Sequence, residues 1–383
     1  MDENADYTGP KPHLYGFLSN HETTEKVFKI TTEPNPIYIE EARDTNKLNF
    51  DFTITGLTDR KLVIKFIKAA VYDESDNLIT YRHLNHNAVG TPGIQTIGKH
   101  ETNGKEPLDI YNPFHSYTKK IPLTKLRYMF TFQDPETLKE YYYGNNIITP
   151  TVYHQKARLT IPIKGMITIL DGHDYYSHHR RFSMNLVRKI TNNAFWSNFS
   201  RYSVDLTHLG PDGNTRKMTP NEYPSNYDFH YTDITKFYTH EADVYAPADG
   251  VVVDVVENLD DLIDSRFDFD KAIQEGRVAN LAGNYVVIKH NESEYSHLFH
   301  LLKDSVEVSV GETVGRNQRI AKIGFSGAST TYSHLHYQLL DGANFLRANP
   351  LPCRFSDVVL LHGKEAIRYD LASIDTGDII LQE

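Results

Sequence analysis

Short runs in which hydrophobic and polar positions alternate fill most of the chain, and long amphipathic helical patterns are scarce. The run 48–55 alternates cleanly, which is the period of a strand with one buried face. Further strand-like runs lie at 61–72, 126–132 and 157–163, with turn-forming residues between them. Short strands at regular spacing are typical of a β-sandwich. The pattern therefore predicts a mainly β protein in which residues 24–165 form a β-sandwich-like module.

The character of the sequence changes near residue 166, where polar and chemically capable side chains become dense. We predict a second β domain over 166–350 with two polar insertions, at 206–241 and 258–282. Long polar segments inside a compact domain are usually functional or inserted. The second insertion contains a helical pattern at 269–274.

The two ends of the chain and its composition narrow the possibilities further. Residues 1–23 are polar and predict a loosely held arm, whereas 351–383 predict a short closing segment. The net charge of −10 argues against nucleic acid as a partner, because such binding depends on Lys and Arg. A single cysteine, Cys353, excludes internal disulfides and thiolate zinc clusters. A metal site would therefore use His, Asp, Glu or Asn.

Membrane and secretion signals are not evident in the sequence. No apolar run reaches the roughly 18 residues that would cross a bilayer, so we predict no transmembrane segment. The first residues are polar and do not resemble a signal peptide. Either the protein stays inside the cell or the chain has been trimmed, and both readings stay open at this point.

The most informative pattern is the pair His334-Leu335-His336, which follows a turn rich in Gly and Ser. If this run is a strand, His334 and His336 point to the same face, because side chains repeat every second residue. Two imidazoles on one rigid edge suit a metal-assisted hydrolase, in which one holds the ion and the other handles a proton. A pair of surface histidines is the simpler alternative for an isolated His-x-His.

An ordered series of short sequence motifs spans about 100 residues and ends at this pair. With these motifs, the segment 171–345 resembles the LytM/lysostaphin-type zinc endopeptidases, which cut peptide cross-links of bacterial cell walls. The series consists of Val244-Tyr-Ala-Pro-Ala-Asp-Gly-Val-Val, Gly283-Asn-Tyr-Val-Val-Ile-Lys-His, Tyr295-Ser-His-Leu-Phe-His-Leu, Val306-Glu-Val-Ser-Val-Gly, Ile323-Gly-Phe-Ser-Gly and His334-Leu-His. The sandwich-like module lies outside the resemblance. Members with large insertions form the subgroup that this chain resembles.

The resemblance implies a small open β-structure with a tetrahedral zinc ion on one sheet face. Its ligands are a His, an Asp and the second His of the His-x-His pair, so His336 would bind the metal. Two further histidines would assist proton transfer and stabilise the oxyanion, and His334 is one of them. His300 is favoured over His297 for the other role, because His300 lies directly before the phrase at Val306; His297 is interpreted as a surface residue.

The Asp ligand has two candidates. Asp243 precedes Val-Tyr-Ala-Pro, but the expected His four residues earlier is Thr239. Asp205 lies in the alternating run Arg-Tyr-Ser-Val-Asp-Leu, upstream of the strand that begins at Val244. We therefore favour Asp205 as the ligand and interpret Asp243 as a carboxylate at the entrance of a strand.

The first His ligand is missing from its expected place, where Arg201 stands four residues before Asp205. Asn198 offers only a neutral amide oxygen, which is a weaker zinc ligand than imidazole but can contact substrate. The cluster His178-His179-Arg180-Arg181 could supply a replacement, and His179 is the preferred candidate over His178.

The arginines of the same cluster have a different predicted use. Arg180 or Arg181 could hold a substrate carboxylate through two parallel hydrogen bonds. They could equally be structural and pair with carboxylates of the protein. His173, beside Asp174, is interpreted as a turn residue.

The sequence supports two hypotheses about function. The first is a zinc-dependent endopeptidase that hydrolyses peptidoglycan cross-links or stem peptides with a metal-activated water, which would place the protein in the periplasm or outside the cell. The alternative is a degenerate relative that keeps the fold as a binding or regulatory platform, because the first His ligand is displaced. A lipoyl- or biotinyl-type carrier domain fits poorly, since Lys322 lies inside a strand-like run.

Overall fold

The computed structural model describes residues 28–56, 59–85, 101–102, 104, 106–175, 177–217, 233–263, 267–329 and 332–383. The predicted arm at 1–23 lies outside these ranges. The chain divides into two compact units, one with Met1–Thr31, Thr53–Ile110 and Leu123–Thr149, and the other with Thr32–Phe52, Tyr111–Pro122 and Pro150–Glu383. These units interleave along the sequence, whereas the predicted division at residue 165 is sequential and stays a prediction.

The first unit is built on two β-sheets, one with the strand order β1-β4-β7 and one with the order β10-β9-β5-β6. The strands are β1 Phe28–Glu33, β4 Asp51–Gly56, β5 Val63–Tyr72, β6 Leu78–Asn85, β7 Leu108–Tyr111, β9 Lys125–Gln133 and β10 Glu140–Ile148. Phe28 on β1 and Phe132 on β9 stack with ring centroids 4.0 Å apart, so apolar side chains join the two sheets. The predicted sandwich-like module is confirmed.

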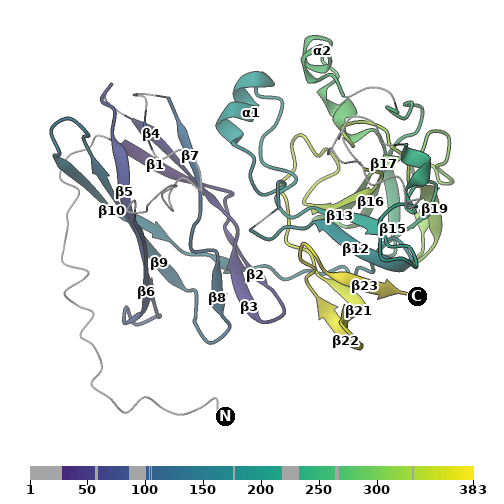
Figure 1. The fold of residues 1–383 in the computed structure, drawn as a ribbon, viewed down its shortest axis with the longest axis horizontal. Helices are drawn as coiled ribbons and strands as arrows, with labels where there is room; N and C mark the ends of the chain where they lie inside the picture. The colour runs from purple at the N-terminus through teal and green to yellow at the C-terminus, as the bar shows by residue number, and fades with distance from the viewer. Residues whose placement is uncertain are drawn as a thin grey trace. The chain divides into compact units, whose positions relative to one another are not determined.

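The second unit contains a ten-stranded sheet in the order β18-β15-β16-β17-β20-β13-β12-β23-β21-β22 (Figure 1). Its strands are β12 Gly165–Asp171, β13 Val204–His208, β15 Gly250–Val256, β16 Asn284–Asn291, β17 Glu294–Leu301, β18 Thr313–Val314, β20 Leu335–Leu340, β21 Phe355–His362, β22 Glu365–Ala372 and β23 Ile379–Gln382. The segment 351–383 therefore supplies three strands of this sheet. The predicted mainly β fold class is confirmed.

Two smaller sheets complete the second unit. One has the order β11-β2-β3-β8 and the other pairs β14 with β19. Their strands are β2 Tyr38–Glu41, β3 Thr45–Leu48, β8 Ser116–Thr118, β11 Thr151–Val152, β14 Asp243–Tyr245 and β19 Arg319–Lys322.

Strand alternation gives the central strands β13 and β20 two different faces. The side chains of one face belong to the main hydrophobic core, namely Val204, Leu206, Leu335, Tyr337 and Leu339. The alternate positions are polar and equally buried, namely Asp205, His336 and Gln338. The antiparallel register places Asp205 directly opposite His336. One face of the sheet therefore stabilises the fold while the other collects ionisable groups.

The helices are short and belong to the segments around the polar face. They are α1 Met184–Ile190, α2 Phe269–Gln274 and the 3-10 helices η3 Ile234–Lys236 and η4 Val278–Ala282. The helix predicted at 269–274 is confirmed, but α1 was not expected, because its few residues show no clear apolar period. Ser183 caps α1 by accepting a hydrogen bond from the Leu186 amide. None of the described helices is long and apolar enough to cross a membrane.

Glu294 anchors the start of β17 to the segment that enters the second unit. Its carboxylate accepts hydrogen bonds from the Tyr153 hydroxyl at 2.7 Å and from the Lys156 and Ala157 amides at 2.7 and 2.6 Å. The Asn291 side chain donates a further bond at 2.7 Å. Burial alone would raise the pKa of Glu294, but these donors outweigh burial and lower the pKa.

We expect Glu294→Gln to reduce the free energy of unfolding by about 1–3 kcal/mol, because its NH₂ group would face backbone N–H donors. The lowered pKa of the carboxyl means that its contribution is complete above the ordinary glutamate pKa of about 4.3 and is lost as the pH falls through the folded-state value. Urea unfolding between pH 3 and 7 measures both effects. Glu292→Gln, whose side chain is 91% exposed, is the matched control. Equal unfolding of the two variants would contradict the anchoring role.

Candidate metal centre

Three histidine side chains converge around one oxygen of Asp205, and a fourth histidine lies beside them. The distances to Asp205 Oδ1 are 3.0 Å from His336 Nδ1, 3.4 Å from His179 Nε2 and 3.5 Å from His334 Nε2. His300 lies beside them, with ring centroids 5.0 Å from His334 and 5.8 Å from His336. All five side chains are buried. The structure thus brings together residues that are far apart in the sequence.

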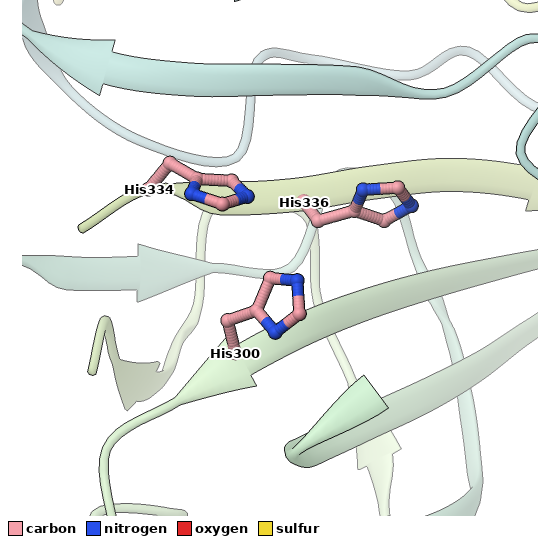
Figure 2. A group of neighbouring side chains, drawn as sticks. All are labelled: His300, His334 and His336. Carbon is pink, nitrogen blue, oxygen red and sulfur yellow. The ribbon is translucent and has the colours of Figure 1, made fainter. Parts of the chain in front are cut away.

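Two sheet strands position three of these rings (Figure 2). His336 lies on β20 and His334 directly precedes it, so both rings lie along one strand edge. His300 lies near the end of the neighbouring strand β17, and its ring is directed towards the pair. The backbone of His300 has a φ of 64°, and the β16–β17 register shifts nearby. This left-handed residue breaks the strand alternation and brings His300 to the polar face.

Hydrogen bonds fix which ring nitrogens face the centre of the cluster. His300 Nδ1 lies 2.9 Å from the Ser326 carbonyl, and His334 Nδ1 lies 2.9 Å from the Tyr332 carbonyl. A carbonyl only accepts, so each Nδ1 donates and each neutral ring keeps an unprotonated Nε2. His336 has the opposite arrangement, since its Nε2 lies 3.1 Å from Gln338 Oε1 and leaves Nδ1 towards Asp205.

Asp205 carries the negative charge of the cluster. The Tyr332 hydroxyl donates to Asp205 Oδ2 at 3.0 Å, which leaves Oδ1 to face the imidazoles. Burial by itself would raise the pKa of Asp205, but the facing rings of His179, His334 and His336 hold this pKa well below its ordinary value. The carboxyl is therefore ionised at neutral pH.

Three histidines of the cluster, His179, His300 and His334, are neutral at the same pH. Burial lowers the pKa of His179 to about 3, although Asp205 opposes the shift. Burial, together with the neighbouring His334 and His336 rings, lowers the pKa of His300 well below its ordinary value. The pKa of His334 is also lowered, again mainly by burial. Neutral imidazoles beside an ionised carboxylate are in the protonation states that metal ligands require.

Arg201 occupies the position at which the resemblance implies a histidine ligand, and the structure shows what its side chain contacts instead. Arg201 is buried and donates to Asp51 Oδ2 at 2.7 Å and to Asn49 Oδ1 at 3.2 Å. It therefore fixes the segment before β13 and does not face the cluster. His179, from the upstream cluster, reaches Asp205 instead. Within the described residues, His179 Nδ1 has no hydrogen-bond partner.

Two competing candidates lie elsewhere. His297 was expected at the surface, and this is wrong: its ring is fully buried and its Nε2 lies 2.9 Å from the Gly342 carbonyl. His297 faces Gln338 across the β17–β20 pair and so occupies the polar face without reaching Asp205. Asp243 begins β14 and pairs with Arg319 at 3.7 Å, outside the cluster.

The three predicted substrate-binding side chains have different surroundings. Arg180 is buried and donates to the Asn112 carbonyl at 3.2 Å. Asn198 is buried and donates to the His179 carbonyl at 2.8 Å. Neither side chain is presented to solvent, which corrects the expectation of direct substrate contact. Arg181 is exposed but donates to the Tyr175 carbonyl, and its contact with substrate stays a prediction.

Two other expectations about the 171–181 segment can be compared with the structure. His178 is exposed and hydrogen-bonds Asp171, whereas His179 is buried with its Nε2 3.4 Å from Asp205 Oδ1. His173, interpreted as a turn residue, does lie in a bend; it is also buried, with its Nδ1 3.2 Å from Glu40 Oε1.

Sequence reasoning missed three side chains that shape the cluster. Gln338 fixes the His336 ring, and its position two residues after His336 on one strand could have indicated this. Tyr332 binds Asp205 from a non-helical, non-strand segment, for which the sequence carries no periodic signal. Phe299 stacks on His336 with an interplanar angle of 9°, which follows from strand pairing alone.

Comparison with known proteins gives the family of this site. Residues 232–348 match peptidase family M23, and this range includes His300, His334 and His336. This part of the chain is similar to peptidase family M23. The expected LytM/lysostaphin-type relationship is thereby confirmed. Asp205 and His179 precede the matched range, and their proximity to each other and to His336 is seen only in the tertiary structure.

A curated relative matches a shorter part of the M23 region. The peptidoglycan DD-endopeptidase ShyA of Vibrio cholerae is 44% identical over 59 residues. This match covers 15% of the present chain and 13% of the relative. The chain therefore spans only a small part of the length of the relative that it matches.

Solved structures with partial likeness include three peptidases. The catalytic domain of lysostaphin from Staphylococcus simulans is 18% identical and covers 31% of this chain and 80% of its own, with a TM-score of 0.19. LytU is 17% identical, with coverages of 52% and 83% and a TM-score of 0.23. A zinc containing peptidase from Vibrio cholerae is 16% identical, with coverages of 61% and 82% and a TM-score of 0.21. The family assignment rests on the sequence match, because TM-scores this low do not establish a shared fold.

We expect Arg201→Met to destabilise the second unit by about 3–5 kcal/mol, because it breaks the buried ion pair between Arg201 and the Asp51 carboxylate. The double variant Arg201→Met/Asp51→Leu removes both charges and should recover much of the loss. Thermal unfolding of both variants measures the difference. A double variant as unstable as the single one would contradict a simple ion-pair role.

Proposed function

We propose that this protein is a zinc-dependent endopeptidase that hydrolyses peptide bonds in peptidoglycan cross-links or stem peptides. The convergence of His179 Nε2, Asp205 Oδ1 and His336 Nδ1 beside two further neutral imidazoles carries the proposal. The match to peptidase family M23 and the partial match to a peptidoglycan DD-endopeptidase support the reaction class and the substrate. Such a substrate would place the protein in the periplasm or outside the cell.

The donor set and its spacing fit a zinc ion. Two imidazole nitrogens and one carboxylate oxygen form a common set for catalytic zinc, which keeps an open fourth position. Ligand bonds of about 2.0–2.1 Å in a tetrahedron separate the ligand atoms by roughly 3.3 Å. The separations of 3.0 and 3.4 Å from Asp205 Oδ1 to His336 and His179 agree with that spacing. The cysteine side chain is buried outside this group, so sulfur takes no part.

The remaining groups of the cluster would position these ligands. Gln338 Oε1 accepts a hydrogen bond from His336 Nε2, and this bond directs His336 Nδ1 towards the metal position. Tyr332 holds Asp205 Oδ2, and Asn198 holds the backbone carbonyl of His179. We therefore assign Asn198 a positioning role in place of direct substrate contact.

A bound metal and the two imidazoles that would not bind it, those of His300 and His334, would have different chemical roles. A bound zinc ion would supply Lewis-acid assistance by lowering the pKa of water and polarising the substrate carbonyl. The unprotonated Nε2 of His300 or His334 accepts a proton as the water oxygen attacks the carbonyl carbon. The protonated ring then stabilises the oxyanion and returns the proton to the amide nitrogen. The C–N bond breaks, and the products are a carboxylate and an amine.

The alternative role as a degenerate binding platform was motivated by Arg201 at the expected ligand position. The proximity of His179 to Asp205 weakens that motivation, because a third ligand is available from another segment. The presence of His300 and His334 with free Nε2 atoms also favours an enzyme, since a platform has no need of two buried, neutral imidazoles.

We expect His179→Ala to lower zinc affinity by more than the roughly 10- to 100-fold that loss of an outer-shell partner costs. Its exposed neighbour provides the control, since His178→Ala should bind zinc as the wild type does. Competitive titration of metal-free protein against a chelator measures both affinities. If the two variants bind zinc equally, His179 is not a ligand.

Removal of the His300 or the His334 imidazole should strongly reduce the rate of hydrolysis but leave zinc bound. We expect His300→Ala and His334→Ala to reduce hydrolysis of purified peptidoglycan by about 10²- to 10⁴-fold while zinc content is maintained. Release of soluble fragments, loss of activity with a chelator and recovery with zinc are the measurements. Zinc-loaded wild-type protein that releases no fragments would support the platform role instead.

A further inference from the structure

The row of ionisable residues on the polar face of the sheet continues one strand beyond the candidate metal centre. Asp205 on β13 lies opposite His336 on β20 and, on its other side, opposite Asp171 at the end of β12. Residues directly opposite each other in an antiparallel pair share a face, with Cβ atoms about 4.5–5.5 Å apart. The register shift between Ile169 and Asp171 places this carboxylate, in place of Leu170, opposite Asp205. The sheet therefore carries a second carboxylate beside the first.

Two histidines that follow β12 complete a group of three possible metal ligands. Asp171, His178 and His179 each offer one ligand atom, and these three atoms lie within 4.8 Å of one another. His178 Nδ1 hydrogen-bonds Asp171 Oδ2, and the rings of His178 and His179 have centroids 4.1 Å apart. His179 also reaches Asp205, so this group and the candidate metal centre share one imidazole.

The candidate metal centre uses only one nitrogen of the shared imidazole. His179 Nε2 lies 3.4 Å from Asp205 Oδ1, whereas its Nδ1 has no hydrogen-bond partner among the described residues. The side chain is only 4% exposed, and a buried polar atom without a partner is costly. Either ring nitrogen of a histidine can bind a metal, and an imidazole that releases its ring proton to solvent can bind one ion through each. The unpartnered Nδ1 therefore points to a ligand beside this ring.

Ions and water can reach the group of three. Asp171, His178 and His179 line a pocket of about 570 Å³ that the candidate metal centre also lines. The side chain of His178 is 61% exposed, and that of Asp171 is 18% exposed. The ligand atoms of a tetrahedral zinc ion are roughly 3.3 Å apart, so a small rotation of the exposed His178 ring would close the group around an ion. Water in the pocket would fill the remaining position.

We propose that Asp171, His178 and His179 bind a second divalent transition-metal ion beside the zinc of the candidate metal centre. Two imidazoles and one carboxylate favour zinc, copper or nickel, whereas magnesium and calcium prefer oxygen ligands. The second ion binds more weakly than the first, because His178 is exposed and the two ions repel each other. This site goes beyond the proposed catalytic zinc and does not require that a peptide is cleaved.

Calorimetric titration of the metal-free protein with zinc tests the second site. We expect two binding events in the wild type, one tight and one weak, and magnesium should not reproduce the weak event. Asp171→Asn and His178→Ala should each weaken the second event by roughly 10-fold or more and leave the tight one unchanged. Asn keeps an oxygen that can accept the hydrogen bond from the His178 amide, so the backbone contact is retained. Competition with a chelator reports the tight event, in which His178 takes no part.

The matched control is His362→Ala. His362 is an exposed histidine at the end of β21, and it belongs to none of the groups of possible metal ligands found among the described residues. This variant should keep both binding events. A single zinc equivalent in the wild type, or a weak event that persists in Asp171→Asn and His178→Ala, would overturn the second site. A weak event that is also lost in His362→Ala would mean binding to surface histidines in general and would overturn it too.

An activity measurement separates this inference from the proposed function. Because His179 is shared, the second ion draws on a ligand of the first, and excess zinc should slow peptidoglycan hydrolysis by the wild type but not by Asp171→Asn. If no hydrolysis occurs at any zinc concentration, the proposed function fails and the titration still decides the second site. Hydrolysis with only one bound zinc equivalent retains the peptidase and overturns the second site.

Discussion

The buried carboxylate of Asp205 is the group around which the second unit is organised. A buried charge is costly unless it is paired and hydrogen-bonded, so the surrounding residues must compensate it. Tyr332 binds one oxygen, and His179, His334 and His336 surround the other. The lowered pKa values of His179 and His334 keep these two rings neutral at physiological pH, so they do not cancel the negative charge of Asp205. That excess charge makes the cluster a suitable place for a cation.

Strand pairing supplies the rigidity that such a cluster needs. β13 and β20 place Asp205 opposite His336, while the alternate residues Val204 and Tyr337 are fixed in the hydrophobic core. A one-residue register slip would exchange the two faces and bury core residues at the polar site. The core thus determines the separation of the candidate ligands. Preorganisation of this kind allows metal ligation and proton transfer without rearrangement of the backbone.

Apolar side chains line a pocket beside the charged cluster and are the second feature of the site. The same His336 ring contacts Asp205 on one side and stacks on Phe299 on the other. A ligand at the cluster therefore meets both a polar centre and an aromatic wall. α1 and α2 lie in segments that precede β13 and β16, so pocket shape can vary without disturbing the sheet that carries the ligands.

The sequence alone determined the mainly β character, the His334–His336 pair and the preference for Asp205 over Asp243. The first two follow from local periodicity, because strands repeat every two residues, whereas the preference for Asp205 follows from the resemblance to the LytM/lysostaphin-type family. It also indicated His300 over His297, although strand parity alone placed the two on opposite faces. The left-handed conformation at His300 brings both to the polar face, and only the structure reveals it.

Only the tertiary structure decided what accompanies Asp205. His179 reaches it from a segment 26 residues upstream, while Arg201 turns away to pair with Asp51. Tyr332, Gln338 and the phenylalanine wall also join the site through long-range packing. Such contacts depend on strand register and chain path, which no short window of sequence encodes. The sequence thus identified the His334–His336 side of the site, and the tertiary structure identified the groups that surround Asp205.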